Sequence, residues 1–291
     1  MSRVYDFNDH GAAASPAGGS GPHRGLLLLE LPRWTVEYGA SRLVDLLHAA
    51  SGPALPGERD LGRGRPVLVL PGFSANDRLT GRLRGHLVRR GWEVHGWNLG
   101  SNHGLTETIV TGLPRRLTEV ADRYDEPVSV VGWSFGGLLA RWLAHEHPDR
   151  VRQVVCLGSP WRAEGERTRA TGLFEKSREK HGIVADAREI VDRLRGPVPV
   201  PLTAVWSKSD GIVPWRGCTV DQQDGGAGRA PAENVEVVSS HVGMVANPLV
   251  LSVVVDRLRQ DPAHWQPFAW SRVVPGLGGV AGLGGVAGAA S

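Results

Sequence analysis

The sequence has few of the features that mark secreted or membrane-spanning proteins. Among 291 residues there are only two cysteines, Cys156 and Cys218, which is too few for a disulfide framework. The apolar run 26–29 ends at once at Glu30, so it is too short for a signal-peptide core or a membrane span. We therefore expect a cytoplasmic protein without stable membrane insertion, with export by another route left open.

Charge of one sign is also scarce. The chain has 33 Lys and Arg against 30 Asp and Glu, a formal net charge of +3, and no basic block interleaved with aromatic residues. This balance gives no indication of a nucleic-acid partner. The sequence contains no H-E-x-x-H motif and no cysteine pair, and His145 and His147 would face different sides of a helix. We expect no metal site, and no cofactor is implied.

The two ends differ in composition from the rest of the chain. Residues 1–24 are rich in Gly, Ala, Ser and Pro, and residues 276–291 repeat LGGVAG in tandem, without helical or strand periodicity in the first segment. We predict a disordered N-terminal tail over 1–24 and a flexible C-terminal tail over 276–291. The intervening residues 25–275, in a chain with 41% hydrophobic residues, can bury a substantial core.

Short apolar runs alternate with amphipathic segments between these ends. Continuous runs such as VLVL are typical of parallel strands that are buried on both faces. This alternation predicts an α/β fold with a mostly parallel sheet of about six strands and helices on both faces. The predicted strands are 67–70, 92–97, 128–131, 151–157, 202–206 and 235–238, and the predicted helices are 33–49, 77–90, 106–124, 134–147 and 248–260.

One long segment interrupts the alternation. Residues 161–198 contain two or three helical stretches and no strand. Long insertions between strands often carry function, so we predict a small helical lid over a site. A long crossover helix with a loop is the alternative.

The pentapeptide Gly132-Trp133-Ser134-Phe135-Gly136 matches G-x-S-x-G. A buried strand is predicted just before it and a helix just after it, which is the context of a nucleophile elbow. Side chains two residues to either side of the serine would collide in so tight a turn, which explains both glycines. The pattern predicts that Ser134 is exposed at the edge of the sheet as a nucleophile.

A serine nucleophile needs a base and a carboxylate that orients it. Asp210 follows the predicted strand 202–206, and His241 follows the strand 235–238, so both are expected at the same edge as Ser134. The chain order Ser, Asp, His is the order expected for this elbow. Asp186, Asp221 and Asp224 are the alternative acids.

Together, the strings LPGF, GWSFGG, SKSDGIVPW and SSHVGMVANP resemble lipase/esterase-like bacterial members of the α/β-hydrolase superfamily. The resemblance covers roughly Pro66 to Phe268. It implies an acyl-enzyme mechanism and an oxyanion hole formed by the backbone N–H groups of Phe73 and Phe135. It also implies a reduced sheet, in the order 4-3-5-6-7-8 of the full fold, because the two opening strands are not visible. Pro71-Gly72 stands where many relatives have His-Gly.

Four residues near predicted strand ends are candidates for a substrate pocket: Trp97, His103, Trp133 and Trp161. An apolar pocket beneath a small lid would suit a hydrophobic acyl chain. Core packing is the alternative for the tryptophans, and stabilisation of its loop is the alternative for His103.

The resemblance implies a serine hydrolase that acts on an apolar, small-molecule carboxylic ester. A thioesterase, an acyltransferase or an amidase with the same triad remains an alternative, because fold and triad do not set the leaving group. A non-catalytic binding module on the same fold is a third hypothesis. The sequence does not indicate an oligomeric state.

Overall fold

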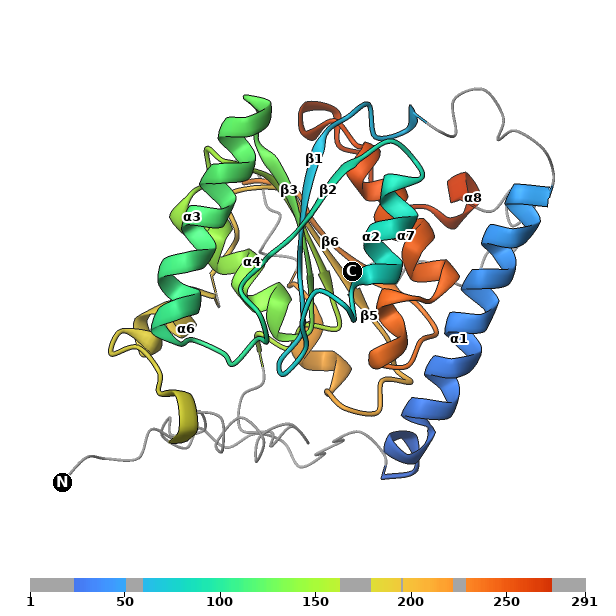
Figure 1. Ribbon diagram of the computed structural model, residues 1–291, viewed down its shortest axis with the longest axis horizontal. Coiled ribbons are helices and arrows are strands. Elements are labelled where there is room, and N and C mark those ends of the chain that lie inside the picture. The colour runs from blue at the N-terminus through green and yellow to red at the C-terminus, as the bar shows by residue number, and fades with distance from the viewer. Residues whose placement is uncertain (1–23, 51–59, 163–178, 195, 222–228, 274–291) are drawn as a thin grey trace, which may run out of the picture.

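The computed structural model describes residues 24–50, 60–162, 179–194, 196–221 and 229–273 (Figure 1). Residues 1–23 and the predicted C-terminal tail 276–291 lie outside these ranges, so both tails remain predictions. Within the described ranges, no helix combines the length and the hydropathy needed to cross a bilayer.

A six-stranded parallel sheet forms the centre of the fold, in the order β2-β1-β3-β4-β5-β6. This is the order that the family resemblance implied. The strand β2 lies on one side of β1, and the strands β3 to β6 follow in sequence order on the other side. The strands are β1 (Pro66–Leu70), β2 (Glu93–Gly96), β3 (Val128–Trp133), β4 (Val151–Leu157), β5 (Leu202–Trp206) and β6 (Ala232–Glu236).

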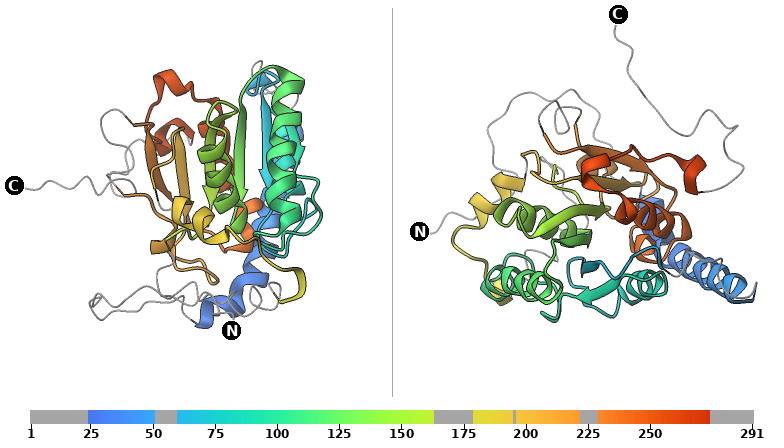
Figure 2. Two further views of the ribbon diagram at one scale, coloured as in Figure 1. Left: turned by 90° about the vertical axis from the view of Figure 1, so that its left-hand side faces the viewer. Right: turned by 90° about the horizontal axis from the view of Figure 1, so that it is seen from above.

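Helices cover both faces of the sheet, as predicted (Figures 1 and 2). On one side lie α3, α4 and α6, and on the other lie α2 and α7, with α1 outside α7. The helices are α1 (Arg24–Ala50), α2 (Gly81–Val88), α3 (Glu107–Tyr124), α4 (Phe135–Glu146), α6 (Ala187–Leu194), α7 (Pro248–Arg259) and α8 (Trp270–Val273), with 3₁₀ turns η2 (Trp215–Cys218), η4 (Val242–Val245) and η5 (Pro262–His264).

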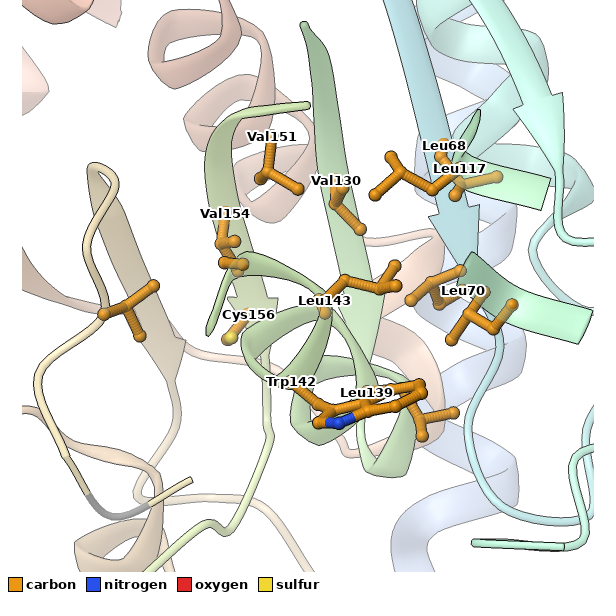
Figure 3. Packing of buried hydrophobic residues seen from close by; sticks show 14 of the residues in the cluster. Leu68, Leu70, Leu117, Val130, Leu139, Trp142, Leu143, Val151, Val154 and Cys156 are labelled. Atoms are coloured by element: carbon orange, nitrogen blue, oxygen red, sulfur yellow. The ribbon is translucent and has the colours of Figure 1, made fainter. Parts of the chain in front are cut away.

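Alternate residues of the central strands point to opposite faces of the sheet and belong to two separate hydrophobic cores. Leu68 and Leu70 of β1 pack with α3 and α4, whereas Val67 and Val69 pack with α2 and α7. Figure 3 shows the first of these clusters, in which Leu143 of α4 lies over the sheet. Because both faces are covered, the strands β1, β3 and β5 are buried along their whole length, which explains their mainly apolar sequences.

The last strand begins three residues and ends two residues earlier than predicted, over Ala232–Glu236 instead of 235–238. It is an edge strand that pairs only with β5, and within it only Val235 is buried. An edge strand is covered on fewer sides and needs few apolar residues. The apolar run 235–238 therefore indicated only the C-terminal part of this strand, and its first three residues were missed.

Helix α1 is longer than predicted, and the side chains described in its central part, 28–43, turn a polar face inward. It begins at Arg24 and contains Pro32, whereas the prediction was 33–49. Val36 and Leu43 are 71% and 54% exposed, while Glu30 is only 3% exposed. Hydrogen bonds to loops of the sheet therefore decide which side of α1 faces the protein.

Only parts of the insertion 161–198 belong to the described residues, and residues 163–178 lie outside them. Helix α6 buries Ile190 and Leu194 in the same cluster as α4. The N–H of Val184 donates to the carbonyl of Leu105 at 2.9 Å. The C-terminal half of the insertion is thus packed on the domain, and its role as a lid remains a prediction.

Candidate active site

Ser134 lies in a sharp turn between β3 and α4. Its backbone has φ 55° and ψ −124°, an unfavourable conformation for a residue with a side chain. A Cβ atom at Gly132 would lie 2.3 Å from the Gly136 carbonyl oxygen, and one at Gly136 would lie 2.4 Å from that of Leu70. The turn therefore excludes side chains at both glycines, as the elbow motif predicted.

A third glycine of the elbow was missed from the sequence. A Cβ atom at Gly137 would lie 1.9 Å from the hydroxyl oxygen of Ser159. Ser159 is fully buried, so this serine supports the turn from behind and does not reach the reaction edge. The doubled glycine in GWSFGG was the available signal.

The structure brings the three predicted triad residues together. The Oγ atom of Ser134 lies 3.0 Å from Nε2 of His241, and Nδ1 of His241 lies 2.6 Å from Oδ2 of Asp210. Asp210 and His241 are each only 3% exposed, whereas Ser134 is half-buried. Three residues from three different loops thus form one hydrogen-bonded chain that ends at an accessible hydroxyl.

The carboxylate of Asp210 is held in place by its own loop. Its Oδ1 atom accepts hydrogen bonds from the N–H groups of Ile212 at 2.8 Å and Val213 at 2.9 Å. Its other oxygen is left for His241. The loop therefore aims one carboxylate oxygen at the imidazole and fixes the tautomer with a proton on Nδ1.

The environment of His241 changes the pKa of its imidazole. Burial by itself lowers the pKa of His241, but the charge of Asp210 and its hydrogen bond, together with the nearby charge of Glu30, outweigh burial and raise it above 6.5. A raised pKa means a stronger base. This environment favours the transfer of a proton from Ser134 to Nε2.

Trp133 contacts the loop of the catalytic base. Its Nε1 atom donates to the carbonyl of His241 at 3.0 Å, and the two rings lie 5.8 Å apart. This contact positions the loop of His241 from the strand that carries the nucleophile.

The loop after β1 approaches the nucleophile closely. A Cβ atom at Gly72 would lie 3.1 Å from Cβ of Ser134, and the rings of Phe73 and Phe135 lie 6.1 Å apart. The two residues predicted to form the oxyanion hole are therefore neighbours on either side of Ser134. Their role as donors remains a prediction.

Asn102 holds this loop and was missed from the sequence. Its side chain donates to the carbonyl of Pro71 at 2.8 Å, and its backbone exchanges hydrogen bonds with Ser74 and Ala75. Asn102 is fully buried. No local motif in WNLGSNHG marks such a residue, because its partners are about 30 positions away.

A mainly apolar cavity lies between α4 and α6, and Ser134 itself is not among its lining residues. Phe135, the residue after Ser134, forms part of its wall, and so does Trp161 from the start of the insertion. Trp161 is thus the candidate pocket residue that the structure places at a cavity. The other apolar lining residues include Leu105, Leu138, Leu139, Trp142, Ile190 and Val191.

Two other pocket candidates lie elsewhere. Trp97 is fully buried in the core, and its Nε1 atom donates to the carbonyl of Gly100, so it has no surface to offer a substrate. His103 stacks on His181 of the insertion, with ring centroids 3.9 Å apart, and is not among the residues that line the cavity. Burial, together with His181 and Lys180, lowers the pKa of His103.

The two alternative acids that the structure describes, Asp186 and Asp221, are not bonded to the base. Asp221 is ion-paired with Arg162, Asp186 is exposed just before α6, and Asp224 lies outside the described residues. In the described part of the chain, no cluster of three or more His, Cys, Asp or Glu could hold a metal ion. Asp210 is the carboxylate that the structure places against His241.

Comparison with known proteins identifies the fold. A family model described as the alpha/beta hydrolase fold matches residues 123–200, which include β3, the elbow at Ser134 and α4. The parallel sheet and the serine elbow agree with this match. The chain has the α/β-hydrolase fold.

Sequence relatives of this α/β-hydrolase domain are esterases. The chain is 41% identical over 109 residues to a pimeloyl-[acyl-carrier protein] methyl ester esterase from Neisseria meningitidis serogroup A, a match that covers 38% of this chain and 35% of the relative. It is 31% identical over 106 residues to the esterase of the same name from Aeromonas hydrophila, covering 34% and 39%. The chain thus matches less than half the length of either relative.

Solved structures with a similar fold include lipolytic enzymes. A structure of the metagenome-derived lipolytic enzymes LipS and LipT aligns with a TM-score of 0.54 and 18% identity, over 72% of this chain and 100% of that chain. Lipase B of Aspergillus fumigatus aligns with a TM-score of 0.51 and 18% identity, over 72% and 57%. At this identity the similarity concerns the fold alone.

Proposed function

We propose that this protein is a carboxylic ester hydrolase of the esterase or lipase type. The observation that carries the proposal is the hydrogen-bonded chain from Ser134 through His241 to Asp210, at 3.0 Å and 2.6 Å. It begins on a strained elbow and ends on a buried carboxylate, which is the arrangement that makes a serine hydroxyl nucleophilic. The esterase names of the sequence relatives support the same chemistry.

In the proposed reaction, Ser134 Oγ attacks the ester carbonyl carbon while its proton moves to Nε2 of His241. The carbonyl oxygen becomes an oxyanion that accepts hydrogen bonds from the N–H groups of Phe73 and Phe135. His241 returns the proton to the departing alcohol, which leaves an acyl group on Ser134. Water then attacks the acyl group through the same two proton transfers, and the carboxylic acid leaves. Asp210 holds the imidazole and stays ionised throughout.

The proposed substrate class draws on the cavity between α4 and α6, which Phe135, the residue after Ser134, helps to line. Its walls are mainly apolar, so the acyl part of the ester is proposed to be apolar and to lie between α4 and α6. The insertion 161–198 would form the outer wall as a lid. We propose a cytoplasmic location for this activity.

The first test labels the nucleophile. A fluorophosphonate probe should modify wild type and a Ser252→Ala control, because Ser252 lies on α7 and donates to Pro248 of its own helix. Ser134→Ala should lose both the label and ester turnover. Labelling that persists in folded Ser134→Ala, or a folded wild type that takes no label, would refute the proposal.

The second test asks which acyl bond is cleaved. p-Nitrophenyl esters of increasing chain length, matched acyl-thioesters and matched anilides are compared with wild type and Ser134→Ala. The proposal expects the highest kcat/KM for esters with an extended apolar acyl chain. A preference for thioesters or anilides would keep the triad and reassign the reaction.

A further inference from the structure

Helix α1 presents a buried carboxylate to both loops of the catalytic site. Glu30 accepts hydrogen bonds from the N–H of Gly211 at 2.7 Å, from that of His241 at 3.1 Å and from that of Val242 at 3.1 Å. Gly211 follows Asp210 in the chain, so a single side chain joins the acid loop to the base loop. Both carboxylate oxygens accept, Oε1 from Gly211 and His241 and Oε2 from Val242.

Two further residues of α1 extend this contact. Glu37 accepts from the N–H and the hydroxyl of Ser240 at 2.8 Å and 2.6 Å, and Arg33 donates to the hydroxyl of Ser209 at 3.0 Å. Residues 30, 33 and 37 lie on one face of the helix. The residues before and after Asp210, and the residues before and after His241, are therefore all held by α1.

The turn after His241 also accommodates the side chain of Glu37. A Cβ atom at Gly243 would lie 1.3 Å from Oε2 of Glu37 and 2.5 Å from the hydroxyl oxygen of Ser240. Position 243 therefore excludes a side chain while Glu37 is in place. The turn after His241 is built to receive a carboxylate from α1.

Simple docking of a helix would not need buried carboxylates. Helices usually dock through apolar residues, yet Val36 and Leu43 of α1 face outward. Burying a carboxylate is unfavourable unless hydrogen bonds compensate, and here the backbone N–H groups of the two catalytic loops supply them. The placement of Glu30 is thus best explained by what it does for those loops.

The charges around His241 come from two elements. The loop after β5 contributes Asp210, and α1 contributes Glu30 and Glu37 together with Arg33, which lies 3.9 Å from Glu37. Burial opposes a charge on His241, and the raised pKa of this residue reflects Asp210 first and then Glu30. A second negative charge favours the imidazolium that forms when Ser134 gives up its proton.

We propose that Glu30 is a positioning residue of the catalytic base, which fixes the loops of Asp210 and His241 relative to each other and stabilises the imidazolium. The inference rests on the proposed function, in which His241 is the general base. It assigns a catalytic contribution to α1, which lies N-terminal to the first strand of the sheet.

The test compares Glu30→Gln with Ser41→Ala. Ser41 also lies on α1, but its hydroxyl accepts from Arg82 of α2 at 2.6 Å and does not touch the catalytic loops. Glu30→Gln should lower kcat about tenfold, which corresponds to about 1.4 kcal/mol of barrier, and should leave KM within about twofold. It should also shift the acid limb of the pH profile downward, because the lost charge lowers the pKa of His241.

Ser41→Ala weakens the docking of α1 without changing the charge, so its pH profile should match wild type and its kcat should stay within about twofold. Glu30→Asp keeps the charge and shortens the reach, so it should lower kcat while the pH midpoint stays in place. If Glu30→Gln does not fold, Glu30→Asp decides. Unchanged kcat in Glu30→Asp, unchanged kcat and midpoint in Glu30→Gln, or an equal loss in Ser41→Ala would each overturn the proposal.

A histidine titration separates this inference from the proposed function. The imidazole signal of His241 is assigned by NMR from its loss in His241→Asn and is followed against pH in wild type and Glu30→Gln. It should titrate at lower pH in the variant, whether or not any ester is turned over. Equal titration in both proteins would refute the role of Glu30, whereas a wild type without ester turnover would refute the proposed function alone.

Discussion

Replacement of Asp210 by asparagine should leave a folded protein without a base. In wild type, Oδ1 of Asp210 accepts from two backbone N–H groups, and Oδ2 lies 2.6 Å from Nδ1 of His241. In Asp210→Asn, the amide oxygen must keep the two N–H donors, so the NH₂ group faces Nδ1. An NH₂ group can only donate, which forces the proton of the imidazole onto Nε2. Nε2 then faces Ser134 as a donor and cannot take its proton.

The expected loss in kcat is about 10⁴-fold, as for the wrong tautomer in a well-studied serine protease. This corresponds to about 5.4 kcal/mol of barrier, at about 1.36 kcal/mol for each factor of ten. The thermal midpoint should stay close to wild type, because the two backbone contacts of residue 210 survive.

The assay is p-nitrophenyl ester hydrolysis as a function of pH, with circular dichroism as the check on folding. The matched control is Asp256→Asn on α7, which removes a carboxylate paired with Arg257 and lies outside the catalytic loops. A folded Asp210→Asn within about tenfold of wild-type kcat would show that the tautomer argument is wrong.

Three further predictions test other parts of the structure. The raised pKa of His241 places the midpoint of the acid limb of kcat/KM above pH 6.5, because the base must be neutral; a midpoint below 6.5 in a pH-rate profile would contradict this. Gly136→Ala should lower the free energy of unfolding by at least about 2 kcal/mol in urea titrations, since its Cβ would lie 2.4 Å from the carbonyl oxygen of Leu70; wild-type stability would refute the close approach. Burial raises the pKa of Cys156 to about 12 and that of Cys218 well above 9.0. Neither thiol should therefore react with a disulfide reagent until the protein is unfolded. Rapid reaction of either thiol in native buffer would show that it is not buried as the structure places it.

The sequence by itself determined the sheet and the chemistry of its edge. Continuous apolar runs such as 67–70 indicate burial on both faces, and a strand-serine-helix sequence with flanking glycines has few other structural solutions. Because parallel strands end at one edge, the positions of Asp210 and His241 after later strands were enough to predict their meeting with Ser134, and the structure places them in contact.

Only the tertiary structure decided which residues support that edge. Glu30 lies 211 positions from His241, and Asn102 lies 31 positions from Pro71, so neither contact leaves a local pattern in the chain. Tertiary contacts also decide the orientation of α1, in which Val36 and Leu43 are exposed while Glu30 is buried. Local sequence specifies which segments form strands and turns, whereas long-range hydrogen bonds select the helix face that completes the site.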